Sequence, residues 1–528
     1  MNENDNYIKK GHCLFKNIKQ SVLLLFVLFG WSKSMNAQIY GDFPYFQSFT
    51  SGIKPSEISL PDGAGPNAAV FTSTGLQLTP AENRKFGAVF INNKSFNSAV
   101  GIKIAFNYAI YDGSGADGIS VFLFDAAVAP LIGGAAGGAL GYNYRRANNL
   151  YSDNRKEGLS GAYLAIALDV YGNFKMSKFN PAERVNGTQL PGILWHNNGK
   201  SHVTLRGAQG KYLDANGRGA GFTGYPVLRT QATMEHSEKK GLLSGATINA
   251  SGAYDINDDV KGSKFNLRSE AFTTDPNNVA YRKVFIDLIP NILGGFNITV
   301  KVQHQKTVTT VIDNYWYPAS LTYYENANAA VTDFNILNDS GLSSRHVLDA
   351  TVPEFFKIGF AASTGVMNDI HKIWNVEVVL PYAAEVKDDV GSICKNSSII
   401  INPYSNDLAY SGSTTGNPTG SPENIDFNQF RFLNADQTTA SNPFLVTNEQ
   451  GTFSYNKATG FVTFVPLSSF SGTASIEYTI KGKTYPEGTF QPFGDEAFRS
   501  VSAKISIEVM KCKVITNPML PSKNRPKK

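Results

Sequence analysis

Three short stretches of this sequence carry residue types that could bind a polar ligand. Asp117 lies in an Ala-Asp-Gly tripeptide (116–118), at the start of the alternating apolar run GISVFLFD (118–125). A Gly-rich stretch, GGAAGGALGY (133–142), and the run IALDVYGNF (166–174) follow it. An acid at the mouth of a buried strand is unfavourable unless it accepts hydrogen bonds. The alternative for each stretch taken alone is a turn-forming Asp or a flexible Gly-rich connection.

Runs of β-branched and aromatic residues with a period near two predict the strands that must position these side chains. They occur at 87–93, 100–111, 118–125, 162–174, 201–207, 283–289, 296–303 and 354–363. Because helical periodicity is scarce over the same stretch, the pattern indicates a large antiparallel sandwich. Residues 208–280 are rich in Gly, Asn, Ser and Thr, which predicts long loops or an insertion.

A second, smaller β unit is expected after residue 383, at 384–512. Its last run, 500–509, alternates apolar residues (Val501, Ala503, Ile505, Ile507 and Val509) with polar ones. About 125 residues with strands of this kind are typical of an immunoglobulin-like sandwich. Residues 513–528 form a basic, Pro-containing tail, which we expect to be disordered.

The first 37 residues have the features of a secretory signal peptide. Basic residues precede the apolar run SVLLLFVLFGW (21–31), and small residues follow it, ending at Ala37. The apolar run is too short to cross a membrane as a helix, and no later stretch is long enough. We therefore expect export, with the mature chain in an extracellular or cell-surface location.

Two cysteines, Cys394 and Cys512, follow the predicted signal peptide. In an exported protein an even pair favours a disulfide, although two free thiols remain the alternative. Closing a loop of about 120 residues would stabilise the fold by roughly 4–5 kcal/mol on the chain-entropy model.

The formal net charge of +5 comes from the two ends of the chain. Between the predicted signal peptide and the basic tail, acidic residues slightly outnumber basic ones. No basic patch interleaved with aromatic residues stands out, so nucleic acid is not an expected partner.

The order and chemistry of the stretches described above resemble those of the L-type (legume-type) lectins. That family has an Ala-Asp-Gly before an aromatic strand, then a Gly-Gly-x-Leu-Gly loop, matched here at 116–118 and 137–141. A strand with Asp, an aromatic residue and Asn follows, matched by Asp169, Tyr171 and Asn173. VPEFFKIGFAASTG (352–365) and HKIWNVEV (371–378) resemble the family's closing strand and specificity loop, and the likeness spans about 40–382.

The resemblance implies a concanavalin-like antiparallel β-sandwich, or jelly roll, at 38–383. The second unit, 384–512, separately resembles the bacterial immunoglobulin-like and cadherin-like modules of secreted proteins. It also implies that Asp117 accepts hydrogen bonds from two sugar hydroxyls and follows a cis peptide bond. Asn173 would donate its amide to a hydroxyl, and a backbone N–H at Gly137 or Gly138 would add a donor. Glycans or glycoconjugates are the implied partners.

The remaining residues that the resemblance assigns lie beside these donors and acceptors. Tyr171 would stack on the apolar face of the sugar ring. Gly365, Val366 and Met367 would form the loop that selects which sugar fits. The sequence names neither the sugar nor the oligomeric state.

The metal sites of the family match this chain only in part. In the family a Glu lies two residues before the strand Asp, and the pair bridges a transition metal and calcium; this chain has Ala167 there. A transition metal is therefore not expected, and His202 need not be a ligand. Calcium remains possible on Asp169, Asn173 and the Tyr171 carbonyl, since Ca²⁺ accepts several kinds of oxygen ligand.

Two other functions compete with sugar binding. Some glucanases share this sandwich, and glycoside hydrolysis needs a pair of carboxylates about 5–9 Å apart. The corresponding strand offers Asp169 alone, and Glu183 lies in a predicted loop without a paired motif, so an enzyme is not expected. The other alternative is a structural adhesin that uses the fold without binding sugar.

Overall fold

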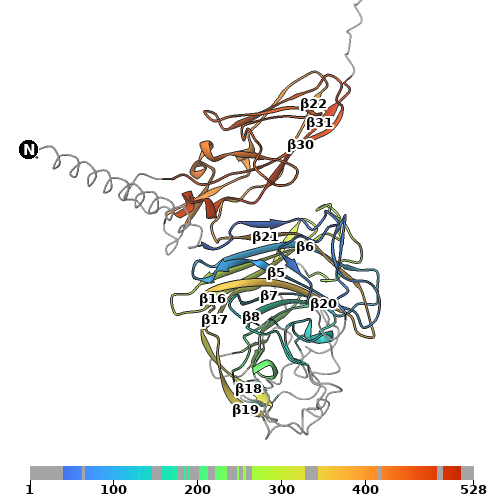
Figure 1. Ribbon diagram of the computed structural model, residues 1–528, viewed down its shortest axis with the longest axis vertical. Helices are drawn as coiled ribbons and strands as arrows, with labels where there is room; N and C mark the ends of the chain where they lie inside the picture. Colours follow the sequence, from blue (N-terminus) through green and yellow to red (C-terminus); the bar gives the residue numbers. More distant parts are fainter. Residues whose placement is uncertain are drawn as a thin grey trace, which may run out of the picture. The chain divides into compact units, whose positions relative to one another are not determined.

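The structure is a computed structural model of the whole chain (Figure 1). It describes residues 40–512 except 62–65, 130, 132, 145–155, 176–183, 186–187, 190–200, 212–219, 235–245, 249–253, 257–263, 327–342, 413–417 and 485–491. The predicted signal peptide, the basic tail and Glu183 therefore lie outside the described residues. The chain divides into two compact units between Pro381 and Tyr382, close to the boundary expected from the sequence.

The described part of the first unit contains a nine-stranded sheet. Its order is β14 (Tyr254–Ile256), β13 (Ala246–Ile248), β12 (Val227–Ala232), β11 (His202–Arg206), β8 (Ala162–Asp169), β7 (Gly118–Asp125), β20 (Phe355–Ser363), β5 (Phe86–Asn97) and β2 (Ile58–Ser59). Each neighbouring pair is antiparallel. The strand that begins after Asp117, β7, is central, so its backbone is paired on both sides (Figure 1).

An eight-stranded antiparallel sheet lies against the first one. Its order in the described residues is β17 (Thr307–Tyr317), β16 (Phe296–His304), β15 (Arg282–Pro290), β6 (Ile102–Tyr111), β21 (Ile370–Val379), β4 (Gly75–Thr79) and β3 (Val70–Thr72), with β1 (Tyr45–Gln47) also pairing with β21. Aromatic rings from both sheets meet between them. The ring centroids of Phe106 (β6) and Phe360 (β20) are 5.2 Å apart, and those of Phe296 (β16) and Tyr163 (β8) are 6.0 Å apart. The predicted antiparallel sandwich is confirmed.

A second apolar core covers the outer face of the nine-stranded sheet. Phe122 and Phe124 of β7 pack there with Leu140, Tyr142 and further buried residues of the Gly-rich stretch and its neighbours. Residues on both faces of β7 are consequently buried. A polar side chain on this outer face must therefore find its partners in the loops that cover it.

Short elements complete the described part of the first unit. They are the hairpins β9 (Arg184–Val185) with β10 (Thr188–Gln189) and β18 (Ser320–Asn326) with β19 (Ser343–Asp349), and the 3₁₀ turns η1 (Ser98–Val100), η2 (Gly137–Ala139) and η6 (Ala220–Phe222).

The segment 208–280 was expected to form long loops or an insertion, and its described part differs from that. Residues 227–232 form β12, which pairs along its length with β11 inside the nine-stranded sheet. Leu228 is fully buried, and Thr230 bonds across to Thr204 at 2.9 Å. The weak alternation of VLRTQA hides a strand that is buried on both faces, and its Arg229 interacts with Tyr315 on β17 of the second sheet.

The second unit is also built from two main sheets. The first contains β22 (Asp389–Cys394), β31 (Ala503–Met510), β30 (Gly472–Thr479) and β26 (Arg431–Leu433), and the second contains β23 (Ile399–Ile401), β29 (Phe461–Pro466), β28 (Gly451–Asn456) and β27 (Leu445–Thr447). A hairpin of β24 (Ala409–Ser411) with β25 (Thr419–Ser421) and the turns η8 (Pro403–Ser405), η9 (Pro422–Asn424), η10 (Phe427–Gln429), η11 (Pro492–Gly494) and η12 (Glu496–Phe498) complete it. The alternation expected in the last strand is confirmed, with Ile505, Ile507 and Val509 buried.

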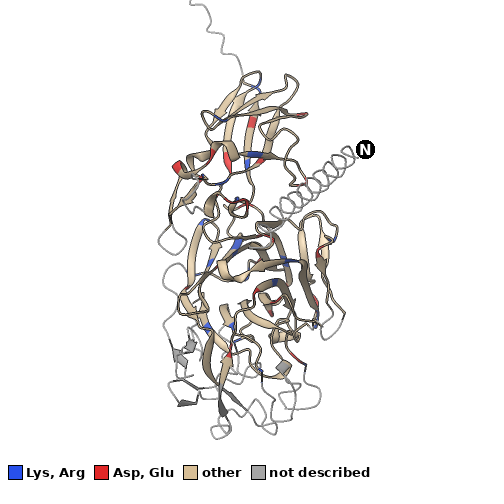
Figure 2. Cartoon of the chain, turned by 60° about the vertical axis from the view of Figure 1, so that its left-hand side comes forward, with Lys and Arg blue, Asp and Glu red and all other residues tan. Residues whose placement is uncertain are grey.

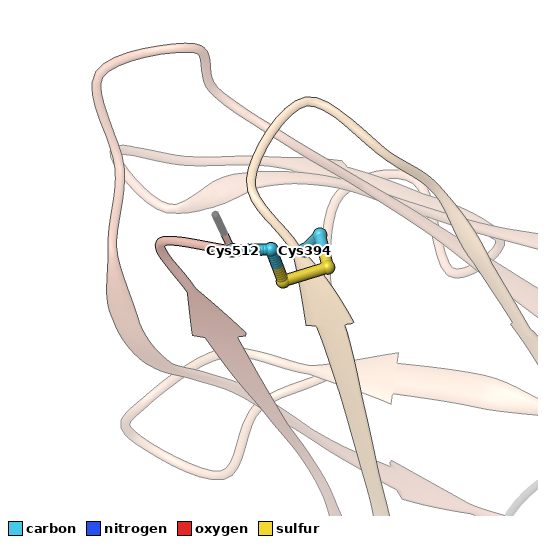
Figure 3. The surroundings of a disulfide bond; sticks show 2 residues. All are labelled: Cys394 and Cys512. Carbon is cyan, nitrogen blue, oxygen red and sulfur yellow. A yellow bond between two sulfur atoms is a disulfide. The ribbon is translucent and has the colours of Figure 1, made fainter. Parts of the chain in front are cut away.

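A disulfide joins the ends of two neighbouring strands of this unit (Figure 3). The first strand of the unit, β22, runs parallel to its last strand, β31. Cys394 ends β22 and Cys512 follows β31, which places their Cα atoms 5.3 Å apart, within the usual disulfide range. The pairing suggested by the sequence is thus present.

Charged residues of both signs are interspersed in the view of Figure 2. Within the described residues, no helix has the length and apolar character needed to span a membrane.

Candidate functional site

Asp117 stands at the point where β7 meets two loops. The Ala116–Asp117 peptide bond is cis, as the resemblance implied. The backbone N–H of Asp117 donates to the Ser363 carbonyl of β20 at 2.9 Å, and its carbonyl accepts from the N–H of Tyr171 at 3.1 Å. These two bonds tie Asp117 to the end of β20 on one side and to the turn after β8 on the other. The Asp117 side chain is 4% exposed.

The loop at 364–368 covers the carboxylate of Asp117 with a glycine. A Cβ on Gly365 would lie 3.9 Å from each carboxylate oxygen of Asp117. The Gly365 carbonyl accepts from the N–H of Arg84 at 2.9 Å, and its N–H donates to the Met367 carbonyl at 2.9 Å. Val366, between them, is 80% exposed. The Asp117 carboxylate therefore lies beneath the loop, which offers backbone groups and the exposed apolar side chain of Val366.

A second set of backbone bonds joins this loop to the residues before Asp117. The N–H groups of Ser114 and Gly115 donate to the Asn368 carbonyl at 2.7 and 3.1 Å. In return the N–H of Asn368 donates to the Ser114 hydroxyl at 3.0 Å. Residues 113–117 and 364–369 are thus held together as one rim, although more than 240 residues separate them in the sequence.

The Gly-rich stretch folds as a compact loop around η2. Gly137 has φ +72°, a conformation that favours glycine, and its carbonyl accepts from the N–H of Leu140 at 2.9 Å. The hydroxyl of Ser120, on β7, donates to the Leu140 carbonyl at 2.6 Å. Gly137 and Gly138 are therefore anchored beside the outer face of β7, the strand that Asp117 precedes.

Tyr171 and Asn173 lie in a turn formed by residues 170–175, directly after β8. Asp169, the last residue of β8, holds this turn from inside: its Oδ1 accepts from the N–H of Gly172 at 2.8 Å and its Oδ2 from the N–H of Lys175 at 3.2 Å. Asp169 is fully buried, whereas Tyr171 and Asn173 are half-buried. Asp117, Gly365 and Tyr171 lie far apart in the sequence but next to one another in the fold. Asn173 belongs to the same turn as Tyr171.

The charges inside this turn belong to Asp169 and Lys175. Burial raises the pKa of Asp169 to about 6, and the Lys175 ammonium and the backbone N–H groups oppose that rise. Burial lowers the pKa of Lys175 to about 8, and Asp169 opposes that fall. Lys175 is 2% exposed, so the turn carries its own buried cation next to its buried acid.

The surroundings of Asp169 do not suit a divalent cation. Ca²⁺ takes about six to eight oxygen ligands, and among the described residues the turn offers a single carboxylate, which is already bonded to two backbone N–H groups. The position two residues earlier, Ala167, belongs to the apolar core together with Phe174. Calcium on Asp169, Tyr171 and Asn173 stays a prediction, and this geometry does not favour it.

His202 pairs with Asp169 across β11 and β8 and is fully buried. Over the residues that the structure describes, no group of three or more His, Cys, Asp or Glu side chains could hold a metal ion.

Three charged residues near the site were missed by sequence reasoning. Lys175 lies two residues beyond Asn173, the last residue of the matched motif. Arg206 ends β11, whose sequence has no feature that indicates a binding or positioning role. Arg268 comes from the 208–280 segment, which was assigned to loops. Arg206 and Lys175 are buried, and neither residue carries a sequence signal that distinguishes it from an exposed cation.

No protein-family model and no curated protein matches this chain. Among solved structures, the VIP36 exoplasmic/lumenal domain in its Ca²⁺/Man3GlcNAc-bound form is 14% identical, covering 64% of this chain and 90% of that chain at a TM-score of 0.30. The lectin from Bauhinia forficata in complex with GalNAc is 11% identical, covering 64% and 99% at 0.29. Peanut lectin with a 9mer peptide is 13% identical, covering 64% and 98% at 0.28. At these identities and TM-scores the likeness assigns no function.

Proposed function

We propose that this chain is an exported carbohydrate-binding protein whose first unit binds glycan hydroxyls at Asp117. The observation that carries the proposal is the placement of the Asp117 carboxylate beneath a glycine, Gly365, at the meeting point of two loops and a turn. A carboxylate accepts hydrogen bonds from two adjacent hydroxyl groups, and a glycine above it lets a ring approach closely.

The groups around Asp117 suit a polar ring with one apolar face. The half-buried Tyr171 offers an aromatic surface, and Asn173, in the same turn, offers an amide donor. Val366 on the rim supplies an exposed apolar contact. A site with so few polar groups is expected to bind single sugars weakly, with Kd in the range of roughly 10⁻³ to 10⁻⁵ M, and to gain strength through multivalency.

Hydrolysis is less well supported than binding. A glycosidase needs two carboxylates that reach the scissile bond. Asp169, the acid expected on the matching strand, is fully buried and holds the backbone of its own turn. We interpret the second unit as an immunoglobulin-like spacer or adhesive stalk.

A glycan array tests the proposal directly. The full chain and its Asp117→Asn variant are applied to the same array, and we expect the variant to lose all signals, because the amide removes the negative charge and replaces one of the two acceptor oxygens by an NH₂ donor. Asp287→Asn on β15 is the matched control, since Asp287 is a half-buried acid on the other sheet. No binding by the full chain, or equal binding by Asp117→Asn, would overturn the assignment. Release of reducing sugar would favour the hydrolase.

A further inference from the structure

The rim and the turn of the candidate site are each fastened by an arginine. We propose that Arg268 and Arg206 position these loops in place of a divalent cation, so that glycan binding needs no metal ion. This inference rests on the proposed function. It concerns residues 113–117 and 364–369, which form the rim, and residues 170–175, which form the turn.

Arg268 fastens the rim through Asp369. Its Nε donates to Asp369 Oδ1 and Oδ2 at 3.0 and 3.2 Å, and its Nη2 donates to Oδ1 at 2.9 Å. The same Nη2 reaches the Gly113 carbonyl at 2.8 Å. One guanidinium thus contacts both halves of the rim, which only a planar fork of donors does well.

Asp369 extends this link to the residue before Asp117. It is fully buried, and its carboxylate also accepts hydrogen bonds from the backbone N–H groups of Ala116 and Gly113. Charge-assisted bonds in a buried place are among the stronger hydrogen bonds in proteins. The position of the Ala116–Asp117 peptide is therefore fixed by an ion pair of the protein itself.

The segment that carries Arg268 is itself anchored on both sheets. The N–H of Phe265 donates to the Thr233 carbonyl at 2.8 Å, and the N–H of Leu267 to the Ser201 hydroxyl at 2.8 Å. One residue beyond Arg268, Ser269 bonds to the backbone of Ile110 through its N–H and its hydroxyl. The hydrogen bonds of residues 265–269 to both sheets therefore fix the position of Arg268 next to the rim.

Arg206 fastens the turn from the other side. It is fully buried on the outer face of the nine-stranded sheet, with its Nε donating to the Phe174 carbonyl at 2.8 Å and its Nη1 to the Tyr225 carbonyl at 2.8 Å. Its Nη2 also donates to the Phe174 carbonyl, and its Cζ lies 4.9 Å from the centroid of the Phe174 ring. Asp169 holds the neighbouring amides of the same turn.

Arg206 and Asp169, which both hold the turn, lie on either side of Ala167, the position where the family has an acid. Across the paired strands, Arg206 lies beside Ala165, Thr204 beside Ala167 and His202 beside Asp169. Ala165, Ala167 and Phe174 fill the space between the anchors as part of one apolar core. The backbone of the turn is thus held at Phe174 by a guanidinium and at Gly172 and Lys175 by a carboxylate.

Removal of metal tests the inference first. The full chain is stripped with millimolar EDTA, returned to buffer with or without millimolar CaCl₂, and applied to the glycan array. We expect the same signals in both buffers, and no heat in a calorimetric titration with CaCl₂ alone. Signals that appear only with calcium would overturn the inference and uphold the proposed function. An array without signals in either buffer would overturn the proposed function itself.

Arg268→Met tests the role of the ion pair. The loss of charge-assisted bonds at the rim should weaken binding to an array-positive glycan by about tenfold or more, and Arg268→Lys should recover part of it. Lys283→Met is the matched control, because the Lys283–Glu377 pair at 3.0 Å on the other sheet is similarly buried, with 19% of the Lys283 side chain exposed against 21% for Arg268. The control should lose stability without losing affinity.

Hydrogen exchange separates positioning from general stability. In Arg268→Met the amides of Ser114, Gly115 and Asp117, which donate to Asn368 and Ser363, should exchange faster than in the wild-type chain. They should be unchanged in Lys283→Met. Wild-type affinity in Arg268→Met, or equal loss of affinity in both variants, would overturn the positioning role. Arg206→Lys, at a fully buried position, is the second variant and tests whether Arg206 positions the turn.

Discussion

Gly365 lies above the carboxylate of Asp117, so that a Cβ at this position would stand 3.9 Å from each carboxylate oxygen. That distance is ordinary van der Waals contact, and a small side chain would fit without moving the backbone. A long side chain would extend over the acid and occupy the space that a ligand needs. The relationship makes the candidate site testable without touching any charged group.

Gly365→Leu should remain folded and lose glycan binding. The carboxylate of Asp117 stays in place, but four added carbons cover it and exclude a sugar ring. Gly365→Ala should reduce affinity only a few-fold, since its methyl group adds a single contact. Affinity is measured on an array-positive glycan, and thermal unfolding shows that both variants keep the fold. Full binding by Gly365→Leu would show that ligands approach Asp117 from elsewhere.

The first unit should lose stability on acidification through His371. Burial lowers the pKa of His371 to about 3, and its Nδ1 bonds to the Thr79 hydroxyl at 2.7 Å. The residue is neutral when folded, whereas the unfolded chain takes up a proton below about pH 6.5. Stability is therefore complete above pH 6.5 and falls by about 1.4 kcal/mol per pH unit between there and about pH 3.

His371→Asn isolates this effect. The amide keeps a partner for Thr79 and does not titrate. Between pH 7 and pH 4.5, the unfolding temperature of the first unit should fall less in His371→Asn than in the wild type. A difference that does not change with pH would contradict the assignment.

The second unit should respond to pH in the opposite direction. The Tyr478 hydroxyl approaches Asp389 Oδ2 at 3.0 Å and Asp407 Oδ2 at 2.8 Å, yet it has only one proton to donate. Burial raises the pKa of Asp389 to about 6 and that of Asp407 to about 7, although the bond from Tyr478 opposes both rises. Both values exceed the unfolded value of 3.8, so the folded unit binds protons more tightly and gains stability as pH falls from about 7 to 4.

Asp407→Asn should remove most of that gain. The variant no longer places two ionised carboxylates beside one hydroxyl, so the second unit should be more stable than wild type at pH 8 and nearly equal to it at pH 5. Thermal unfolding of the second unit at the two pH values measures this. A variant less stable than wild type at pH 8 would show that the Asp407 charge stabilises the unit.

Removing the disulfide should weaken the second unit alone. Cys394→Ser with Cys512→Ser frees a long loop in the unfolded chain and should lower the free energy of unfolding of this unit by about 2–4 kcal/mol. Denaturant unfolding of wild type under oxidising and reducing conditions gives the comparison. Glycan binding by the first unit should be unaffected, and a parallel loss of binding would contradict the division into two units.

The strands that form the sandwich were largely predictable from the sequence. The run 118–125 coincides with β7, because Gly118 marks its start and Asp125 follows a nearly continuous apolar run. β12 was not predicted, because VLRTQA mixes polar with apolar residues and does not alternate clearly. A strand is detected through alternation or through a continuous apolar run, and this segment has neither.

The candidate site was predictable only as far as its motif residues. Asp117 lies next to Gly365 and bonds to the backbone of Tyr171, and the cis peptide before Asp117 is present, whereas the sugar-binding roles of these residues stay predictions. Arg268 was not predictable, because its partner Asp369 lies about 100 residues further along the chain. Arg206 and Lys175 were also missed, since burial of a cation depends on tertiary packing that local sequence does not encode.

The disulfide of the second unit has a mechanical consequence. The chain enters this unit at Tyr382, and the covalent bridge connects Cys394, near that entrance, to Cys512 at the end of the last described strand. A pulling force applied between the two ends therefore travels along residues 382–394, crosses the sulfur atoms and leaves beyond residue 512. The polypeptide from 395 to 511 is closed off by the bridge, so this force cannot draw it out into an extended chain.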